Sequence, residues 1–210
     1  MTDNTNSTVV RALEKAWGEI RVAHPDVPAV VMVVASGSSG RSMKWGHYAE
    51  GRWASRSKKD SKTPEVLISG EGFQRGGVEV MGTLLHEAAH GIAATRKLQD
   101  TSRDGRYHNK VFKQLAEELG LAVEKQGTRG LAATSVPAET AKRWQKTIKE
   151  LDKAIKTFRF AEGPRGGSKG ENRQLLAICQ CRRKIRLSRE TYDAGPIICR
   201  VCERHFEIKE

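Results

Sequence analysis

Three residues with the chemistry of a metal site lie within one short stretch, His86-Glu87-Ala88-Ala89-His90. Residues four apart lie on one face of an α-helix, so two imidazoles at this spacing can bind the same metal ion. The intervening Glu87 then lies beside the metal, where it can take a proton from a metal-bound water. The spacing favours a catalytic zinc on a helix, with His86 and His90 as ligands. The alternative is an amphipathic core helix whose histidines only form hydrogen bonds.

A zinc ion that activates water needs a third protein ligand and keeps its fourth position open. A compact site with a histidine six residues after His90 is excluded, because Arg96 occupies that position. The next candidate is His108, which follows a loop long enough to turn back and opens another predicted helix. Glu117 or Glu118 on that helix is the alternative ligand, and we favour His108.

Hydrolysis of a peptide bond also needs a donor that stabilises the oxyanion of the transition state. By residue type, the candidates are Tyr107, His47 and Tyr48. Nothing in the sequence selects one of them, and each is equally compatible with an ordinary surface position.

The four cysteines of the chain form two close pairs, Cys179 with Cys181 and Cys199 with Cys202. Cysteines of intracellular proteins seldom form disulfides, whereas four thiolates on two turns can surround one zinc ion. We therefore expect a structural zinc ribbon, with a hairpin between the pairs that turns near residues 193–196. Zinc binding would contribute on the order of 10 kcal/mol to the folding of so small a module. Disulfides, a redox pair, or His205 in place of one cysteine are the alternatives.

Positive charge is concentrated in the C-terminal part of the chain. The net charge is +12, with 19 basic and 15 acidic residues before residue 135 and 18 and 10 after it. Such a basic segment suggests a polyanionic partner, most often nucleic acid, although a solvated surface is the alternative. The candidate contacts are Lys142, Lys146, Lys149 and Lys153 on a predicted helix and Arg182, Arg183, Lys184 and Arg186 on the ribbon.

The lysines of the first group lie opposite an apolar stripe. The stripe consists of Trp144, Ile148, Leu151, Ile155 and Phe158, at spacings of four and three residues. This pattern predicts one amphipathic helix that begins at residue 137 and ends near residue 160. Its lysine face either contacts phosphates or is simply solvated.

Further elements must position these groups. Residues 1–6 are expected to be disordered. In chain order we expect a helix from Ser7 that ends before Pro25, strands over 27–35, 44–53 and 66–68, helices over 78–98 and from 109 to Gly120, and linkers over 127–134 and 163–174. No internal repeat is visible.

The chain offers no sign of a membrane or secretory segment. Its longest apolar run, residues 27–35, includes Pro28 and falls well short of the roughly 20 residues that span a bilayer. The N-terminal residues lack the basic and apolar regions of a signal peptide. We expect a cytoplasmic protein without a membrane partner, in which a nucleoid association is compatible with the charge.

Taken in order, these motifs resemble the SprT-like zinc metallopeptidases, a family that includes the Spartan DNA–protein crosslink proteases. The resemblance rests on TLLHEAAH (83–90), GRYHNKVF (105–112) and LAEELGL (115–121). The strand segment PEVLIS before the helix and the paired cysteines near the C-terminus also fit. It covers residues 7–121 and 175–208.

The resemblance implies that His86, His90 and His108 bind zinc and that Glu87 is the catalytic base. It also implies cleavage of proteins, often proteins bound to DNA. Two features depart from the family pattern: the interval from His90 to His108 is longer than in Spartan-type members, and the helix over 137–160 is additional.

The sequence therefore predicts an α+β protein with a zincin-like SprT-like metallopeptidase domain over 7–134. A basic amphipathic helix (135–162), a glycine-rich linker (163–174) and a zinc ribbon (175–210) follow. We expect a zinc metalloprotease with one catalytic and one structural zinc, a protein substrate and DNA as a partner. The alternatives are a DNA-binding zinc protein with a non-catalytic HExxH site, and a DNA-independent peptidase of one dedicated protein.

Overall fold

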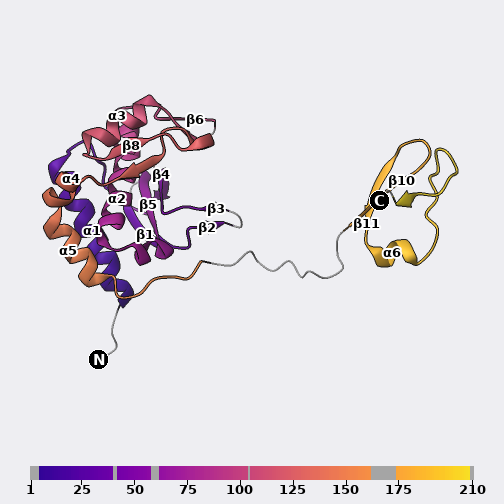
Figure 1. Ribbon diagram of the computed structural model, residues 1–210, viewed down its shortest axis with the longest axis horizontal. Coiled ribbons are helices and arrows are strands. Elements are labelled where there is room, and N and C mark those ends of the chain that lie inside the picture. Colours follow the sequence, from indigo (N-terminus) through magenta and orange to yellow (C-terminus); the bar gives the residue numbers. More distant parts are fainter. Residues whose placement is uncertain (1–4, 40–41, 58–61, 104, 162–173, 209–210) are drawn as a thin grey trace. The chain divides into compact units, whose positions relative to one another are not determined.

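The computed structural model describes residues 5–39, 42–57, 62–103, 105–161 and 174–208 (Figure 1). The chain divides into two compact units, Met1–Glu162 and Gly163–Glu210. Each contains its own hydrophobic cluster, and both combine helices with small sheets. The α+β class predicted from the sequence is therefore confirmed. No helix among the described residues is both long and apolar enough to cross a bilayer.

A mixed three-stranded sheet lies at the centre of the first unit (Figure 1). Its strands are β1 (Val31–Ala35), β5 (Lys62–Ser69) and β4 (Gly46–Ala54), in that spatial order. β5 pairs in parallel with β1 and antiparallel with β4, so β4 lies at an edge. Val66 and Ile68 of β5 are fully buried, while Leu67 between them is half-buried. This alternation shows which face of the sheet carries the core.

The first unit also contains helices. They are α1 (Thr5–Ala23), α2 (Gly77–Thr95), α3 (Lys110–Glu118), α4 (Ala138–Arg143) and α5 (Gln145–Ala154), with the 3-10 helices η1 (Gly70–Arg75) and η2 (Gly127–Arg129). Of these, α1, α2 and η1 contact the sheet directly. α1, α2 and α5 pack against one another, and α2 also packs on β4 and α3. α2 contains four alanines, which favour a helix, and its buried side includes Leu84, Leu85 and Ile92. The core therefore fixes the helix that carries the HEAAH motif.

The N-terminus of α2 receives a cap from α5. The carboxylate of Asp152 accepts a hydrogen bond from the backbone N–H of Gly77 at 2.6 Å. A negative charge at this end of a helix satisfies an otherwise free donor and interacts favourably with the helix dipole. α5 thus stabilises α2 through both packing and capping.

Short hairpins complete the first unit. They pair β2 (Ser38–Ser39) with β3 (Ser42–Met43), β6 (Thr101–Ser102) with β7 (Tyr107–His108), and β8 (Ala122–Glu124) with β9 (Ala133–Ser135). The prediction of a linker over 127–134 was wrong, because η2 and the start of β9 occupy it. The predicted domain boundary after residue 134 falls within β9.

The prediction of one helix over 137–160 was also wrong. α4 ends at Arg143, because the backbone of Trp144 leaves helical geometry, and α5 runs from Gln145 to Ala154. Trp144, Ile148 and Leu151 belong to the same hydrophobic cluster as α1 and α2, so they are part of the first unit's core. Phe158 is 41% exposed, because the chain is no longer helical when it reaches this residue.

Other boundaries differ by a few residues. α1 already includes Thr5, and β1 begins at Val31 rather than at residue 27. β5 is longer than predicted and contains Pro64. The predicted linker over 163–174 lies outside the described residues except for Gln174.

The second unit is a small antiparallel sheet with one short helix. Its strands are β10 (Leu175–Ile178), β11 (Lys184–Leu187) and β12 (Glu207–Ile208), in the order β11-β10-β12. The helix α6 (Arg189–Asp193) lies directly before the turn that we predicted near residues 193–196, and β11 pairs with β10 and not with a second strand between the cysteine pairs. Ala177, Cys179, Leu187, Cys199 and Phe206 form its core. A cluster this small is typical of a module that needs a metal to be stable.

Candidate metal centres

Three histidines converge where α2 meets β7. His86 and His90 come from the middle of α2 and His108 from the end of β7, and their ligand atoms all lie within 4.8 Å of one another. The Nε2 atoms of His90 and His108 are 3.1 Å apart. Nitrogen ligands at about 2.0–2.1 Å from a tetrahedral zinc would be about 3.3 Å apart, so the donor set and its spacing fit one zinc ion.

Two of the histidines are oriented through their other ring nitrogen. Nδ1 of His86 lies 3.1 Å from the hydroxyl of Thr134, and Nδ1 of His90 lies 2.5 Å from a carboxylate oxygen of Asp100. Partners of this kind fix the tautomer and ring orientation of a metal-binding histidine and leave Nε2 for the metal. The sequence analysis identified neither partner. Thr134 lies in a segment assigned as a linker, and Asp100 lies in a polar loop without a distinguishing pattern.

His108 is held mainly through its backbone. Its carbonyl accepts a hydrogen bond from the N–H of Leu131 at 3.0 Å. Gly130 has a φ of +73°, and a Cβ atom there would come within 2.4 Å of the same carbonyl. Asn109 follows directly and caps α3 by accepting from the backbone N–H of Val111. The stretch after η2 therefore fixes the third histidine from one side and the α3 cap fixes it from the other.

The ring of Phe112 forms an apolar wall of the triad, with its centroid 4.4–4.8 Å from all three imidazole centroids. Burial lowers the pKa of His86 well below its usual value, and it lowers the pKa of His108 to about 4; the charge of His90 adds to both effects. Burial also opposes the charged form of His90, but the hydrogen bond and charge of Asp100 outweigh it and raise that pKa. Neutral imidazoles at His86 and His108 are in the form that binds metal.

Glu87 is buried against the edge strand β4. Its carboxylate accepts a hydrogen bond from the backbone N–H of Tyr48. A Cβ atom on Gly46 would lie 2.6 Å from Oε1 of Glu87, so only glycine allows this close approach. Burial raises the pKa of Glu87 to about 7, although His90 and the N–H of Tyr48 act in the opposite direction. A carboxyl group with a pKa near neutrality can both accept and return a proton. Sequence reasoning did not single out Gly46, although a glycine among the aromatic residues of a strand is a signal of close approach.

The alternative third ligands lie elsewhere. Glu118 forms a two-pronged salt bridge with Arg96, at 2.8 and 2.9 Å, and Glu117 lies 3.5 Å from Lys113. Arg96 also contacts Asp26 at 2.7 Å. Both glutamates are exposed, and neither belongs to the histidine cluster.

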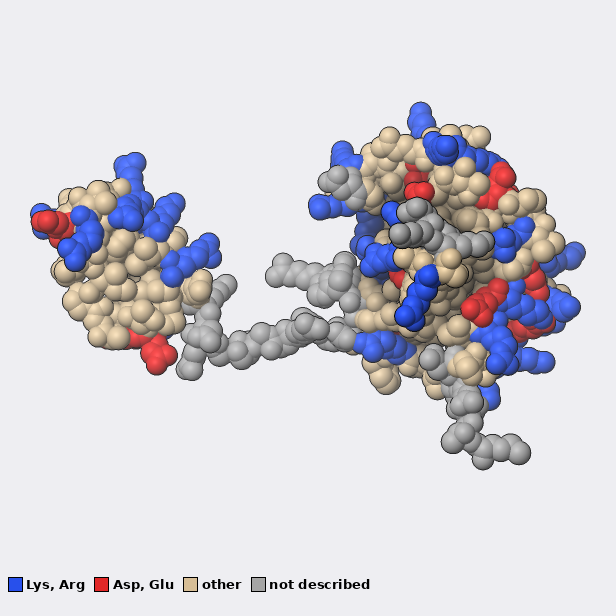
Figure 2. Space-filling model, turned by 180° about the vertical axis from the view of Figure 1, so that it is seen from behind, with Lys and Arg blue, Asp and Glu red and all other residues tan. Residues whose placement is uncertain are grey.

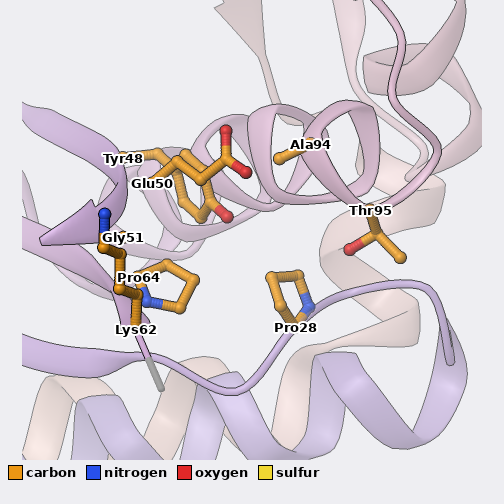
Figure 3. Close-up of a pocket in the computed structure, with 8 residues that line it drawn as sticks. All are labelled: Pro28, Tyr48, Glu50, Gly51, Lys62, Pro64, Ala94 and Thr95. Carbon is orange, nitrogen blue, oxygen red and sulfur yellow. The ribbon is translucent and has the colours of Figure 1, made fainter. Parts of the chain in front are cut away.

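The candidate oxyanion donors lie in different environments. The ring of Tyr107 packs on Gly130 and under the guanidinium of Arg103, 5.1 Å from the ring centroid. Tyr48 points into a cavity of about 430 Å³ between α2 and the strands β4 and β5 (Figure 3). This cavity is lined by Pro28, Glu50, Gly51, Lys62, Pro64, Ala94 and Thr95 as well, and by none of the triad histidines. The half-buried His47 alternates with Gly46 and Tyr48 and so lies on the opposite face of β4.

The four cysteines come together in the second unit. Their sulfur atoms all lie within 4.8 Å of one another, with Cys179 and Cys181 3.2 Å apart and Cys181 and Cys199 3.7 Å apart. No disulfide joins them. Sulfur atoms at about 2.3 Å from a tetrahedral zinc would be about 3.8 Å apart, so this cluster is consistent with a zinc ribbon.

Backbone turns present these thiols. The N–H of Arg182 donates a hydrogen bond to the carbonyl of Cys179, and the N–H of Glu203 donates one to the carbonyl of Cys199. Backbone N–H groups of Val201 and Cys202 lower the pKa of the Cys199 thiol, which favours the thiolate that binds metal. His205, the alternative ligand, forms a backbone bridge with Ile198 and does not belong to the cluster.

The predicted nucleic-acid contacts are all exposed, but they are not equivalent. Lys142 of α4 and Lys146, Lys149 and Lys153 of α5 lie on the solvent side of helices whose apolar residues are buried. In the second unit, Arg182, Lys184 and Arg186 are exposed, whereas Arg183 donates to the sulfur of Cys199 at 3.7 Å. Arg183 thus supports the cysteine cluster. Lysine and arginine side chains are spread widely over the face shown in Figure 2.

No protein-family model, curated protein or solved structure matches this chain. The features of the chain that indicate a function are therefore the histidine cluster and the cysteine cluster. Together they form two candidate metal sites that are consistent with two zinc ions, one in each unit.

Proposed function

We propose that the first unit is a zinc-dependent endopeptidase. The observation that carries this proposal is the convergence of three imidazoles beside a buried carboxyl group one residue from the first of them. A structural zinc site is usually closed by four protein ligands, whereas a catalytic site keeps one position open. Three histidines with an adjacent Glu87 match the second arrangement.

The chain's own residues have distinct tasks in such a reaction. A bound zinc would polarise the scissile carbonyl and lower the pKa of a coordinated water. Glu87 takes the proton from the attacking water and then passes it to the leaving nitrogen. The N–H of Tyr48 keeps the carboxylate in place, while Asp100 and Thr134 keep the imidazoles oriented.

A peptide substrate suits the position of β4. This strand pairs with β5 on one side, and its residues Gly46 and Tyr48 lie directly against Glu87. An extended peptide can bind beside an edge strand through main-chain hydrogen bonds. The scissile bond of a peptide that follows β4 would then pass close to Glu87.

The proposed substrates are proteins associated with DNA. Two features support this choice: the order of motifs resembles that of the SprT-like family, and the chain carries a net charge of +12. Phosphate contacts from exposed lysines position a protein on DNA without reading its sequence. We assign this role to Lys142, Lys146, Lys149 and Lys153 and, in the second unit, to Arg182, Lys184 and Arg186. The proposed place of action is the cytoplasm or nucleoid.

The direct test is cleavage of a DNA-binding protein by the zinc-loaded full chain, with and without DNA. We expect cleavage that DNA accelerates and that Glu87→Gln abolishes while both zinc ions are retained. Cleavage that is indifferent to DNA would favour a peptidase of one dedicated protein. DNA binding without any cleavage would favour a zinc protein with a non-catalytic histidine site.

The DNA contacts need a separate control. We expect Lys146→Glu with Lys149→Glu to weaken DNA binding and to flatten its salt dependence, because fewer counterions are released. Lys110→Glu with Lys125→Glu changes the charge equally at other exposed positions and should have less effect. These variants keep the whole chain, since a fragment that ends at residue 134 would lack the core residues Trp144, Ile148 and Leu151.

A further inference from the structure

A partly exposed tryptophan lies beside the proposed catalytic base. Trp45 is 41% exposed and directly precedes Gly46, whose backbone packs against the carboxylate of Glu87. Consecutive Cα atoms are about 3.8 Å apart, so the Trp45 backbone is within one residue of the base. A peptide that passes Glu87 along β4 would meet this ring next.

The indole is held in one place. The guanidinium carbon of Arg75 lies 4.2 Å from the ring centroid, a cation–π contact. Gly72 of η1 lies beside the ring, since a Cβ atom there would be in ordinary van der Waals contact with Cε3 of Trp45, at 3.6 Å. The backbone is fixed as well, because the carbonyl of Trp45 accepts from the N–H of Ser69 at 2.9 Å.

Arg75, the last residue of η1, is held in place by side chains of α2. Its Nη2 donates to the hydroxyl of Thr83 at 3.0 Å, and its Nη1 lies 3.3 Å from a carboxylate oxygen of Glu79. Its Nε is buried without a hydrogen-bond partner among the described residues, a position that is unfavourable by itself. Thr83 lies three and four residues before His86 and Glu87, on the same side of the helix. The arginine thus connects the ring to the turn of α2 that precedes the site.

From these contacts we infer that Trp45 is a specificity-determining residue of the proposed peptidase. Its ring is a fixed platform for an apolar or aromatic side chain next to the scissile bond. This inference rests on the proposed function. A rigid aromatic surface gains contact area with little loss of conformational freedom, which is why tryptophan is common at binding hot spots. A peptide is favoured over a nucleobase because Trp45 leads directly into β4 and because Glu79 offsets the charge of Arg75.

Trp53, near the far end of β4, supplies a matched control. It is 45% exposed and its indole N–H bonds Glu65 at 2.8 Å, but it lies at the opposite end of β4 from Gly46. Trp45→Ala and Trp53→Ala therefore remove the same exposed side chain near to and far from the base. Trp45→Phe keeps an aromatic ring near the base.

The first experiment maps cleavage sites in denatured casein by mass spectrometry. We expect the wild type to prefer a large apolar or aromatic residue beside the cut. Trp45→Ala should lose this preference and lower kcat/KM for such peptides about fivefold to tenfold, mainly through KM. Trp45→Phe should retain most of the cleavage preference, and Trp53→Ala should have the same preference and kcat/KM as the wild type. Equal profiles for the two alanine variants would overturn the inference.

The second experiment measures binding without cleavage. Zinc-loaded Glu87→Gln protein is titrated with ten-residue peptides that differ only in one phenylalanine or glycine. Trp45→Ala in this background should weaken the phenylalanine peptide about fivefold to tenfold and leave the glycine peptide unchanged. If the wild type cleaves no protein, the proposed function fails. The titration still shows whether Trp45 binds an aromatic peptide side chain, because it does not depend on cleavage. If Trp45→Ala instead weakens the binding of single-stranded oligonucleotides and leaves peptide binding unchanged, the inference is overturned.

Discussion

A carboxylate oxygen of Asp100 lies 2.5 Å from Nδ1 of His90. The contact joins the segment just before β6 to the middle of α2, and it leaves Nε2 of His90 directed at Nε2 of His108. Carboxylate–histidine pairs of this kind orient metal ligands and increase their basicity.

Asp100→Ala should therefore weaken zinc binding at the histidine cluster about 10- to 100-fold. Chelator competition measures this affinity directly, in a protein whose ribbon cysteines Cys199 and Cys202 are replaced by serine so that one site remains. Asp193→Ala removes an exposed carboxylate in the second unit and is the matched control. Unchanged affinity in Asp100→Ala would show that the contact does not orient the ligand.

Gly46→Ala should reduce turnover while the zinc content stays the same. The new methyl group would lie 2.6 Å from Oε1 of Glu87 and 2.7 Å from Cγ2 of Thr83, so the carboxylate must move. A displacement of about 1 Å in a catalytic group can reduce the rate about 100-fold. Gly18→Ala on α1 is the control, because a Cβ atom there meets nothing within 4 Å. Full activity in Gly46→Ala would contradict the placement of Glu87 against β4.

Glu71 should make the first unit sensitive to acid. It is 5% exposed and accepts from Gly37, Ser36, Ser69 and Arg159 at 2.9–3.2 Å. Burial raises its pKa, but hydrogen bonds from the backbone N–H groups of Gly37 and Glu71 and from the hydroxyls of Ser69 and Ser36 outweigh burial and lower the pKa to about 2. Because the folded state favours the carboxylate, its stabilisation is complete above pH 5 and is lost as the pH falls towards 2.

Glu71→Gln should consequently lower the free energy of unfolding by on the order of 3 kcal/mol at pH 7, with a much smaller difference near pH 2. Urea unfolding followed by tryptophan fluorescence reports the first unit, since it holds all four tryptophans. Glu124→Gln changes an exposed glutamate and serves as the control. A Glu71→Gln deficit that is the same at both pH values would show that the carboxylate charge is not the source of the stability.

Local spacing explains what the sequence predicted well. The HEAAH helix was predicted over 78–98 and extends over Gly77–Thr95, because its apolar periodicity and its helix formers act within the segment. His108 was predicted as the third ligand because it closely precedes a helix; it lies at the end of β7, directly before Asn109, which caps α3. The pairing of the cysteines likewise depends on two short turns.

Contacts between distant segments explain what the sequence did not predict. Thr134 reaches His86 from β9, which pairs with β8, and Asp152 caps α2 from a position 75 residues after Gly77. The apolar stripe continues to Phe158, yet α5 ends at Ala154, where the segment has completed its packing against α1 and α2. Periodicity shows which residues are buried together but not where packing ends a helix.

The zinc content of the purified, metal-replete chain tests the two-site account most directly. We expect two zinc ions per chain in the wild type and one after either His108→Ala or the double change Cys199→Ser with Cys202→Ser, because each removes ligands from one cluster. Glu117→Ala and Glu118→Ala should keep both ions. A wild type with one zinc or none, or a His108→Ala protein that keeps both ions while a glutamate variant loses one, would contradict the assignment.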